Sequence, residues 1–259
     1  MFYRRKIILS LLEIFGNKMS KIELQKYLFL FTRLQKEPTF DFIPYKYGCY
    51  SFIAKSDLDN LIKKGFLQSE GNDIQRIDNQ SFISSIDIDD LIKIKKIFKQ
   101  SAEFKNLKHL MHHVYTLAPY YAINSNVKEQ YLNKKEIENI KKTKPVYTEK
   151  ALATIGYEGI SIEAYINKLL KNDIRCLVDV RKNPHSMKFG FSGKTLKHIC
   201  EEAGITYISI RALGIDTDKR KNLITQKDYD ELFEQYRDIN LKHTIDTQKQ
   251  VLEILNKYK

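Results

Sequence analysis

The feature that most constrains the fold is a change of pattern near residue 150. After it, short apolar runs alternate with amphipathic stretches: strands are predicted at 151–156, 174–180 and 205–210, and helices at 161–173, 194–204 and 228–240. Such alternation predicts a parallel sheet with helices on its faces. We therefore expect an α/β domain over residues 151–259, Rossmann-like and three-layered. Ser161 and Ser192 are its expected N-caps, and Gly204 is the expected stop of its second helix.

The N-terminal half has a different order of elements. Apolar residues repeat with a helical period over residues 8–15, a second helix follows the N-cap candidate Ser20, and a third ends near Gly65. Two short strands are predicted around residues 70–72. This order is that of a winged-helix module. We expect a mainly α, winged-helix-like domain over residues 1–125 and a charged helix with a linker over 126–150.

The charge of the chain indicates a polyanionic partner. The formal net charge is +12, and residues 1–145 contribute +9 of it, with 25 Lys and Arg against 16 Asp and Glu. A basic domain favours nucleic acid, here duplex DNA, as the partner over a membrane. The alternative is an ordinary solvated surface. The candidate nucleic-acid contacts are Lys18, Lys21, Lys26, Lys46 and Tyr47.

Other classes of protein are disfavoured. No apolar run approaches the roughly 18 residues of a membrane span, and the N-terminal helix lacks a signal-peptide cleavage site, so we expect a cytoplasmic protein. Three cysteines without CxxC spacing indicate reduced thiols. His109, His112 and His113 have a spacing that can bind metal, but no nearby carboxylate or cysteine completes a set. We expect no metal and no cofactor.

Polar side chains follow each predicted strand, where open parallel sheets bind ligands. Asp179 is a candidate base or a structural partner of Arg181, and Glu158 is a second candidate for acid–base work. The expected catalytic residues are Asp179, Glu158, Arg181 and Ser186. Glycines can expose backbone amides to an anion, and cations can hold phosphate. The expected binding residues are Gly156, Tyr157, Gly159, His185, Lys188, Ser192, Arg211 and Gly214.

The motifs TIGYEG, VDVR, P-x-S with GFS, GI-x-Y and LG occur in this order over residues 153–214. In this the sequence resembles the bacterial family called domain of unknown function 488. The resemblance implies a functional site on an α/β fold, whose reaction is not settled. It also implies a function in nucleic-acid metabolism or in defence based on DNA modification. Many relatives have arginine after the P-x-S serine, whereas this chain has Met187 and then Lys188. Relatives also continue into another strand with a Cys–Glu and a Cys–His–Arg block. Residues 251–259 lack this block, so we expect a truncated or naturally short form of the domain, without the last strand.

The N-terminal half carries a second resemblance. LQKYLFLF (24–31), IPYKYGCYS (43–51) and PYYAINS (119–125) resemble a winged-helix-like domain sometimes fused to this family and similar to antitoxin-associated modules.

Together these features predict a nucleic-acid-associated protein whose α/β domain hydrolyses a glycosidic or phosphodiester bond in a nucleotide or modified base. The main alternative is a non-enzymatic, DNA-binding or antitoxin-like regulatory module. A sensor of a small nucleotide is a third. A sheet of three strands is short, and formation of a homodimer is one way to complete it.

Overall fold

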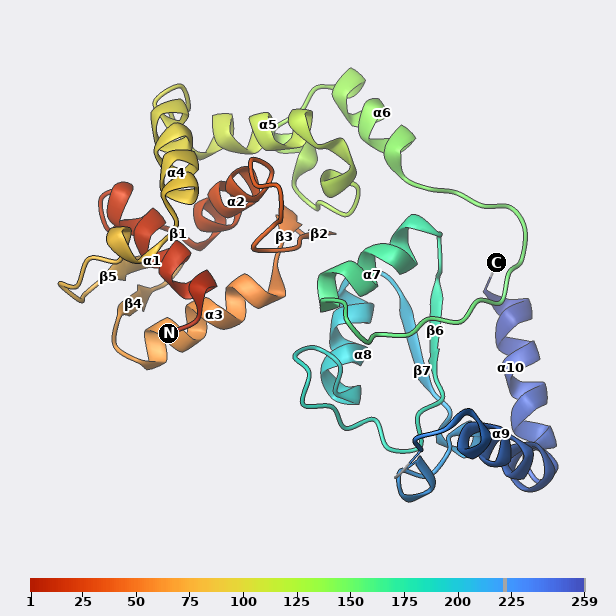
Figure 1. Cartoon of the computed structure of the whole chain (residues 1–259). Coiled ribbons are helices and arrows are strands. Elements are labelled where there is room, and N and C mark those ends of the chain that lie inside the picture. The colour runs from red at the N-terminus through yellow and green to blue at the C-terminus, as the bar shows by residue number, and fades with distance from the viewer. Residues whose placement is uncertain (221–222, 259) are drawn as a thin grey trace. The chain divides into compact units, whose positions relative to one another are not determined.

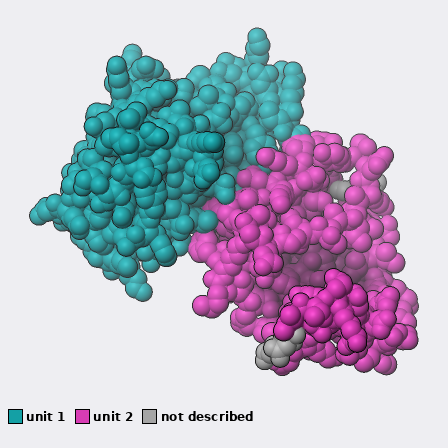
Figure 2. Space-filling model, viewed as in Figure 1, with its two compact units in different colours: residues 1–144 teal, residues 145–259 magenta. Residues whose placement is uncertain are grey.

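The computed structural model describes residues 1–220 and 223–258. The chain forms two compact units, residues 1–144 and 145–259 (Figures 1 and 2). Both are rich in helix, and the fold is mixed α/β with small sheets. No helix among the described residues has the length and apolar character required to cross a membrane.

The first unit combines six helices of the described chain with two small antiparallel sheets. Its helices are α1 (Tyr3–Ile14), α2 (Lys21–Thr32), α3 (Phe52–Lys63), α4 (Ile88–Ser101), α5 (Leu107–Leu117) and α6 (Lys134–Thr143), with short 3-10 turns η1 (Ile83–Ser85), η2 (Pro119–Ala122) and η3 (Lys128–Gln130). Strands β1 (Lys18–Ser20), β4 (Leu67–Glu70) and β5 (Asp73–Arg76) form one sheet in the order β1-β5-β4. Strands β2 (Ile43–Tyr45) and β3 (Gly48–Tyr50) form a separate hairpin.

Local signals explain where these elements begin and end. Ser20 caps α2 as predicted: its hydroxyl accepts from the amide of Glu23 at 3.2 Å, and the Glu23 carboxylate accepts from the amide of Ser20 at 2.8 Å. Gly65 ends α3 with a positive φ of 76°. The predicted pair of strands around residues 70–72 is confirmed as β4 and β5.

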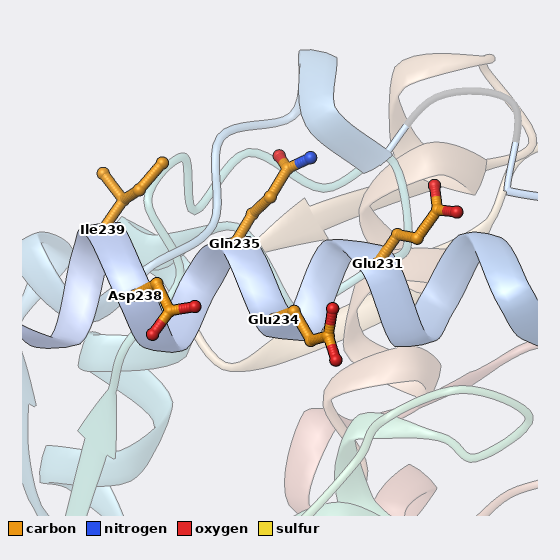
Figure 3. A pocket seen from close by; sticks show the side chains of 5 residues that line it. All are labelled: Glu231, Glu234, Gln235, Asp238 and Ile239. Atoms are coloured by element: carbon orange, nitrogen blue, oxygen red, sulfur yellow. The ribbon is translucent and has the colours of Figure 1, made fainter.

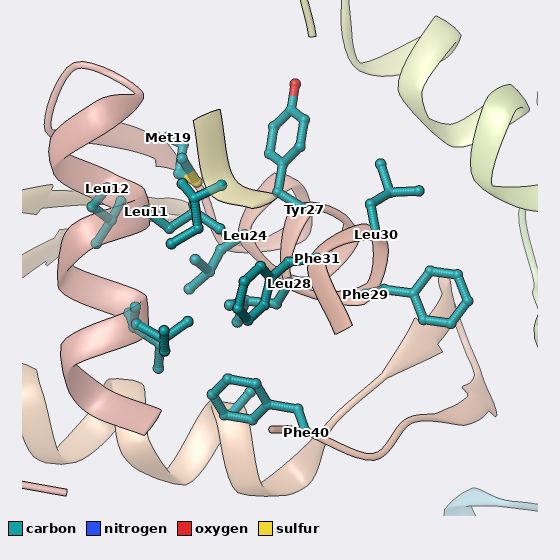
Figure 4. Close-up of a cluster of buried hydrophobic side chains, with 14 of the residues drawn as sticks. Leu11, Leu12, Met19, Leu24, Tyr27, Leu28, Phe29, Leu30, Phe31 and Phe40 are labelled. Atoms are coloured by element: carbon teal, nitrogen blue, oxygen red, sulfur yellow. The ribbon is translucent and has the colours of Figure 1, made fainter. Parts of the chain in front are cut away.

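The core of the first unit lies between α1, α2 and α3. Figure 4 shows the buried side chains of this core, which include Leu11 and Leu12 of α1 and Leu24, Leu28 and Phe31 of α2. The helix predicted around residues 8–15 is confirmed as α1, but residues 7–12 are all buried, so its buried surface is wider than one apolar stripe. Helix α2 is buried on almost all sides from Leu24 to Thr32, which explains the unbroken apolar run YLFLF at residues 27–31.

Two buried polar side chains of α2 hold the β2–β3 hairpin. The ammonium of Lys26 donates to the carbonyls of Tyr47 at 2.5 Å and Cys49 at 2.9 Å. The amide group of Gln25 bonds both the N–H and the C=O of Ser51. Because buried backbone groups need partners, these contacts fix the hairpin against α2.

The second unit has one parallel pair of strands, β6 (Cys176–Asp179) and β7 (Thr206–Ser209). Its helices are α7 (Ile162–Lys171), α8 (Gly193–Glu202), α9 (Gln226–Gln235) and α10 (Ile245–Lys257), with 3-10 turns η4 (Arg211–Leu213) and η5 (Asp218–Arg220) and a π-helical segment η6 (Tyr236–Leu241). In Figure 1, α7 and α8 lie on one side of the strand pair and α10 on the other. Ser161 caps α7 and Gly204 ends α8, both as predicted.

The predicted strand at 151–156 is wrong. This segment forms no strand, and residues 151–154 are exposed, including Leu152. An apolar run forms a strand only where a neighbouring backbone offers a ladder of hydrogen bonds, and β6 and β7 pair only with each other among the described residues. The parallel arrangement is therefore correct, but the three-stranded sheet is not formed.

Candidate functional site

The candidate site lies where β6 and β7 end. The strands are parallel, with Asp179 opposite Ser209, so the loops that follow them begin at the same edge. The amide of Ile210 donates to the carbonyl of Asp179 at 2.9 Å, which extends the pairing to this edge. The segment 180–192 follows β6, and η4 follows β7.

A buried ionic network occupies the end of β6. The Arg181 guanidinium donates to the two carboxylate oxygens of Asp179 at 2.8 and 2.6 Å, and the Tyr207 hydroxyl donates to Asp179 at 2.6 Å. Arg181 also donates to the carbonyl of Phe191 at 2.9 Å. This bidentate pair brings the strand end and the following loop together.

The network keeps Asp179 ionised. Burial alone would raise the pKa of Asp179, but the hydrogen bonds from Arg181 and Tyr207 outweigh it and hold the pKa below its usual value. Burial, together with the Asp179 carboxylate, raises the pKa of Tyr207 to about 12. A carboxylate so bound is a poor proton acceptor. The geometry therefore favours the structural interpretation of Asp179 and Arg181 over direct catalysis.

Tyr157 and Lys188 join the 156–159 segment to the loop after β6. The ring of Tyr157 stacks on Phe191, with centroids 4.6 Å apart and planes 19° apart. The Arg181 guanidinium lies 5.3 Å from the centre of the Tyr157 ring, and the Lys188 ammonium donates to the Tyr157 carbonyl at 2.6 Å. The structure thus brings together four predicted site residues: Tyr157, Asp179, Arg181 and Lys188.

The predicted serines have local partners. The Ser186 hydroxyl accepts from the amide of Lys188 at 3.1 Å, and the Ser192 hydroxyl donates to the Thr195 hydroxyl at 2.8 Å. Ser192 occupies the N-cap position of α8, but its side chain accepts no capping hydrogen bond. No hydrogen bond joins Ser186 to a base in the described chain, so nothing in this geometry activates it as a nucleophile.

Three predicted residues are exposed around this network: Glu158, His185 and Arg211. Their side chains form no ion pair or hydrogen bond with residues 1–220 or 223–258. Gly159 has a positive φ of 72°, whereas Gly156 does not, and a Cβ on either would meet open space. These groups are accessible to a ligand.

Gly214, predicted to bind the ligand, is required for close packing of the backbone. A Cβ at this position would lie 2.1 Å from the backbone nitrogen of Lys182 and 2.5 Å from the carbonyl oxygen of Val180. Only glycine lets the end of η4 approach the loop after β6 so closely. Tyr207 was absent from the predicted site set. The available signal was the GI-x-Y motif, whose tyrosine is Tyr207.

Unit 1 divides its predicted nucleic-acid contacts among three places. Lys18 is exposed and 3.7 Å from Asp73, and Lys21 donates to the Gly71 carbonyl in the β4–β5 turn. Lys46 and Tyr47 are exposed in the β2–β3 turn. The prediction that Lys26 contacts nucleic acid is wrong. Lys26 is 1% exposed, and its ammonium donates to the carbonyls of the hairpin. Burial lowers the pKa of Lys26, and it cannot reach a phosphate.

The side chains of His109 and His112 on α5 interact with neighbouring polar side chains. The Nε2 atom of His112 lies 3.0 Å from the Glu136 carboxylate of α6, and His109 pairs with Asn106. No group of three metal-ligating side chains occurs in the described ranges. Cys49, Cys176 and Cys200 are free thiols.

A shallow hollow on α9 and η6 lies apart from these residues. It is lined by Glu231, Glu234, Gln235, Asp238 and Ile239 (Figure 3). Its three carboxylates would repel a phosphate, and it contains none of the predicted site residues.

Comparison with known proteins bears on the C-terminal unit alone. No curated protein and no solved structure matches the chain. The match to a family model begins at α7 and ends at the last described residue of the chain, so the winged-helix-like resemblance of unit 1 stays a prediction. One family model, described as Domain of unknown function DUF488, matches residues 161–258 of the C-terminal unit.

Proposed function

We propose that this chain is a nucleic-acid-associated protein whose C-terminal unit acts on a nucleotide or modified base. The observation that carries the proposal is the composition of residues 180–200, which follow β6: five Lys and Arg and no Asp or Glu. Lys188 of this segment bonds the carbonyl of Tyr157, the neighbour of exposed Glu158. Lys182 of the segment packs against Gly214, which directly follows the η4 turn that carries exposed Arg211. A local excess of cations favours a phosphate-bearing ligand.

The order of elements in unit 1 supports delivery to DNA. Unit 1 has helices α1, α2 and α3 and the β1-β5-β4 sheet. In the winged-helix arrangement that we propose for it, β4–β5 would be the wing and α3 the recognition helix. Lys55, Lys63 and Lys64 are exposed on or directly after α3, although Lys55 pairs with Asp59. These cations supply phosphate contacts, which position a protein on a duplex without reading its sequence.

Hydrolysis of a glycosidic or phosphodiester bond is the reaction we propose. Because Asp179 is bound by Arg181 and Tyr207, Glu158 is the better candidate for the base that takes a proton from water. Arg211 would hold the phosphate next to the bond that is broken. Lys188, whose ammonium already donates to the Tyr157 carbonyl, would add positive charge to the site.

A second candidate, a non-enzymatic DNA-binding or regulatory module, is favoured by one observation. Two of the four predicted catalytic residues, Asp179 and Arg181, satisfy each other, and a third, Ser186, accepts a backbone hydrogen bond. In this alternative the C-terminal unit binds its ligand and turns over nothing.

Duplex DNA is expected to bind the intact chain with an affinity that falls as salt rises. The logarithm of the affinity should fall linearly with the logarithm of salt, by about 0.9 for each phosphate neutralised. Fluorescence anisotropy with a labelled duplex measures this slope. Lys18→Gln and Lys46→Gln should each reduce the slope by about 1. Lys227→Gln, in acidic α9, is the matched control and should leave it unchanged. The absence of binding at low salt would contradict delivery to DNA.

Glu158→Gln is expected to lower turnover by about 100-fold or more while DNA affinity stays the same, because the amide cannot accept the proton. The assay follows base release and strand cleavage on natural and modified DNA. Glu149→Gln, which removes an exposed carboxylate of the preceding segment, is the control. Equal rates for the two variants would sink the role of Glu158. A lack of turnover on the whole panel would favour the regulatory module.

A further inference from the structure

The loop after β6 presents alternate side chains to solvent. Over residues 183–190 the odd-numbered positions are exposed and the even-numbered positions are buried or half-buried. The exposed set is Asn183, His185, Met187 and Phe189. Residues 184–186 are irregular, and bends and a turn follow at 187–190, where the amide of Phe191 donates to the carbonyl of Lys188 at 3.2 Å. The alternation therefore comes from the turns of this loop and not from a strand.

The inward positions are fastened to the rest of the unit. The carbonyl of Pro184 accepts from the amide of Gly193 at 2.7 Å, and the ammonium of Lys188 holds the Tyr157 carbonyl. Gly190 has a φ of 88°, and a Cβ there would lie 2.7 Å from Ile162. The loop therefore has little freedom to turn its odd-numbered side chains inward.

Two of the outward side chains are apolar. Met187 is fully exposed and Phe189 is 44% exposed. Exposed Lys182 and Lys194 flank them, and neither makes an ion pair with a described residue. This loop thus exposes two apolar side chains next to cations and has no carboxylate. Surfaces that bind single-stranded nucleic acid have a similar composition: aromatic rings stack on the bases, and cations contact the phosphates along the backbone.

We propose that Met187 and Phe189 contact the faces of unstacked bases in single-stranded or locally opened nucleic acid, with Lys182 and Lys194 on the adjacent phosphates. The inference rests on the proposed function and names its substrate class: a nucleic acid whose target base is out of the stack. An enzyme that acts on a base must reach it in that form, because stacking hides the reactive atoms in a duplex.

The size of the apolar surface favours this ligand over a protein partner. A stable protein interface buries roughly 800 Å² on each side, and its centre is depleted in charge. Here two apolar side chains stand among four lysines and arginines of residues 181–194. This is enough to cover one or two bases, and the charge is complementary to their phosphates.

The test compares a single-stranded oligonucleotide, a duplex with one mismatched pair and a fully paired duplex, each carrying 2-aminopurine at the target position. The intact chain should prefer the first two, and binding should change the 2-aminopurine fluorescence as the base leaves the stack. Phe189→Ala should weaken binding to them by about 5- to 150-fold, the range of one lost base–aromatic stack, and Met187→Ala should weaken it less. Affinity for the paired duplex should stay constant.

Two control variants test whether the effect depends on the aromatic ring at position 189. Phe189→Tyr keeps the ring and should bind as the wild type does. Phe233→Ala removes a ring of similar exposure from α9 and should have no effect. Thermal unfolding confirms that each variant is folded.

The possible failures are distinguishable. If the intact chain binds none of the three DNAs, both the proposed function and this inference fall. If it binds DNA with the expected salt dependence but Phe189→Ala and Met187→Ala leave affinity for opened DNA unchanged, only this inference falls. Phe189-dependent binding to vesicles of acidic phospholipid, without preference for opened DNA, would also overturn it.

Discussion

Replacing Asp179 by alanine is expected to lower the free energy of unfolding of the C-terminal unit by about 3–5 kcal/mol. The carboxylate is buried and accepts hydrogen bonds from Arg181 and Tyr207. Its loss leaves the guanidinium of Arg181 largely buried without its counter-charge, which costs more than the original pair contributed. Urea unfolding of the full chain, followed by hydrogen exchange at residues 176–179 and 206–209, measures the effect.

Three further variants separate the causes. Asp179→Ala combined with Arg181→Ala should cost less than the sum of the single changes, because no charge is left unpaired. Tyr207→Phe should cost about 1 kcal/mol, the value of one hydrogen bond. Glu158→Gln, on an exposed residue nearby, should cost almost nothing. If the effects of Asp179→Ala and Arg181→Ala on the free energy of unfolding simply add in the double variant, the two side chains do not stabilise the fold as an ion pair.

The same carboxylate gives stability a pH dependence. The pKa of Asp179 is lower in the folded chain than in the unfolded chain, so its stabilising contribution is complete above the unfolded pKa of about 3.9. It is lost as the pH falls through the lower, folded pKa. The difference in unfolding free energy between the wild type and Asp179→Asn should therefore shrink as the pH is lowered through this window. A difference independent of pH would show that Asp179 is not bound as an ion.

Gly214→Ala is the second change with a large expected effect. The added methyl group would lie 2.1 Å from the Lys182 nitrogen and 2.5 Å from the Val180 oxygen, and both are backbone atoms that no side-chain rotation can move. Either η4 or the loop after β6 must shift, at a cost of about 1–3 kcal/mol or more.

Gly156→Ala is the matched control for this change. It adds the same atom within the same unit, at a position with open space and without a positive φ. Its unfolding free energy should stay within about 0.5 kcal/mol of the wild type. Thermal unfolding compares the two variants directly. Equal midpoints would show that the close contact between Gly214 and the loop after β6 does not require glycine.

Local signals were sufficient to predict much of the fold. Ser20, Ser161 and Gly204 mark helix ends because capping and positive φ depend on a few neighbouring residues. The parallel pair followed from the alternation of strand and helix. The 151–156 segment was misjudged because its apolar sequence has no information on whether a neighbouring backbone is present to pair with it.

The site shows the same limit. The sequence identified Asp179 and Arg181, but left open whether they pair with each other or act on a ligand. Tyr207, which settles how the carboxylate is satisfied, is distant in sequence and reaches Asp179 only through the pairing of β6 with β7. Lys26 was misassigned for a related reason. Helix α2 is buried on nearly all sides, and its sequence does not reveal that this lysine points at the carbonyls of the hairpin.

The alternation in the loop after β6 also bears on how such a protein can change over evolutionary time. Inward residues such as Pro184, Lys188 and Gly190 hold the fold together, so each is constrained by its neighbours. Outward residues such as His185, Met187 and Phe189 can be exchanged at little cost in stability. A lineage can therefore explore new ligands by drift at odd-numbered positions, while the scaffold beneath them stays the same.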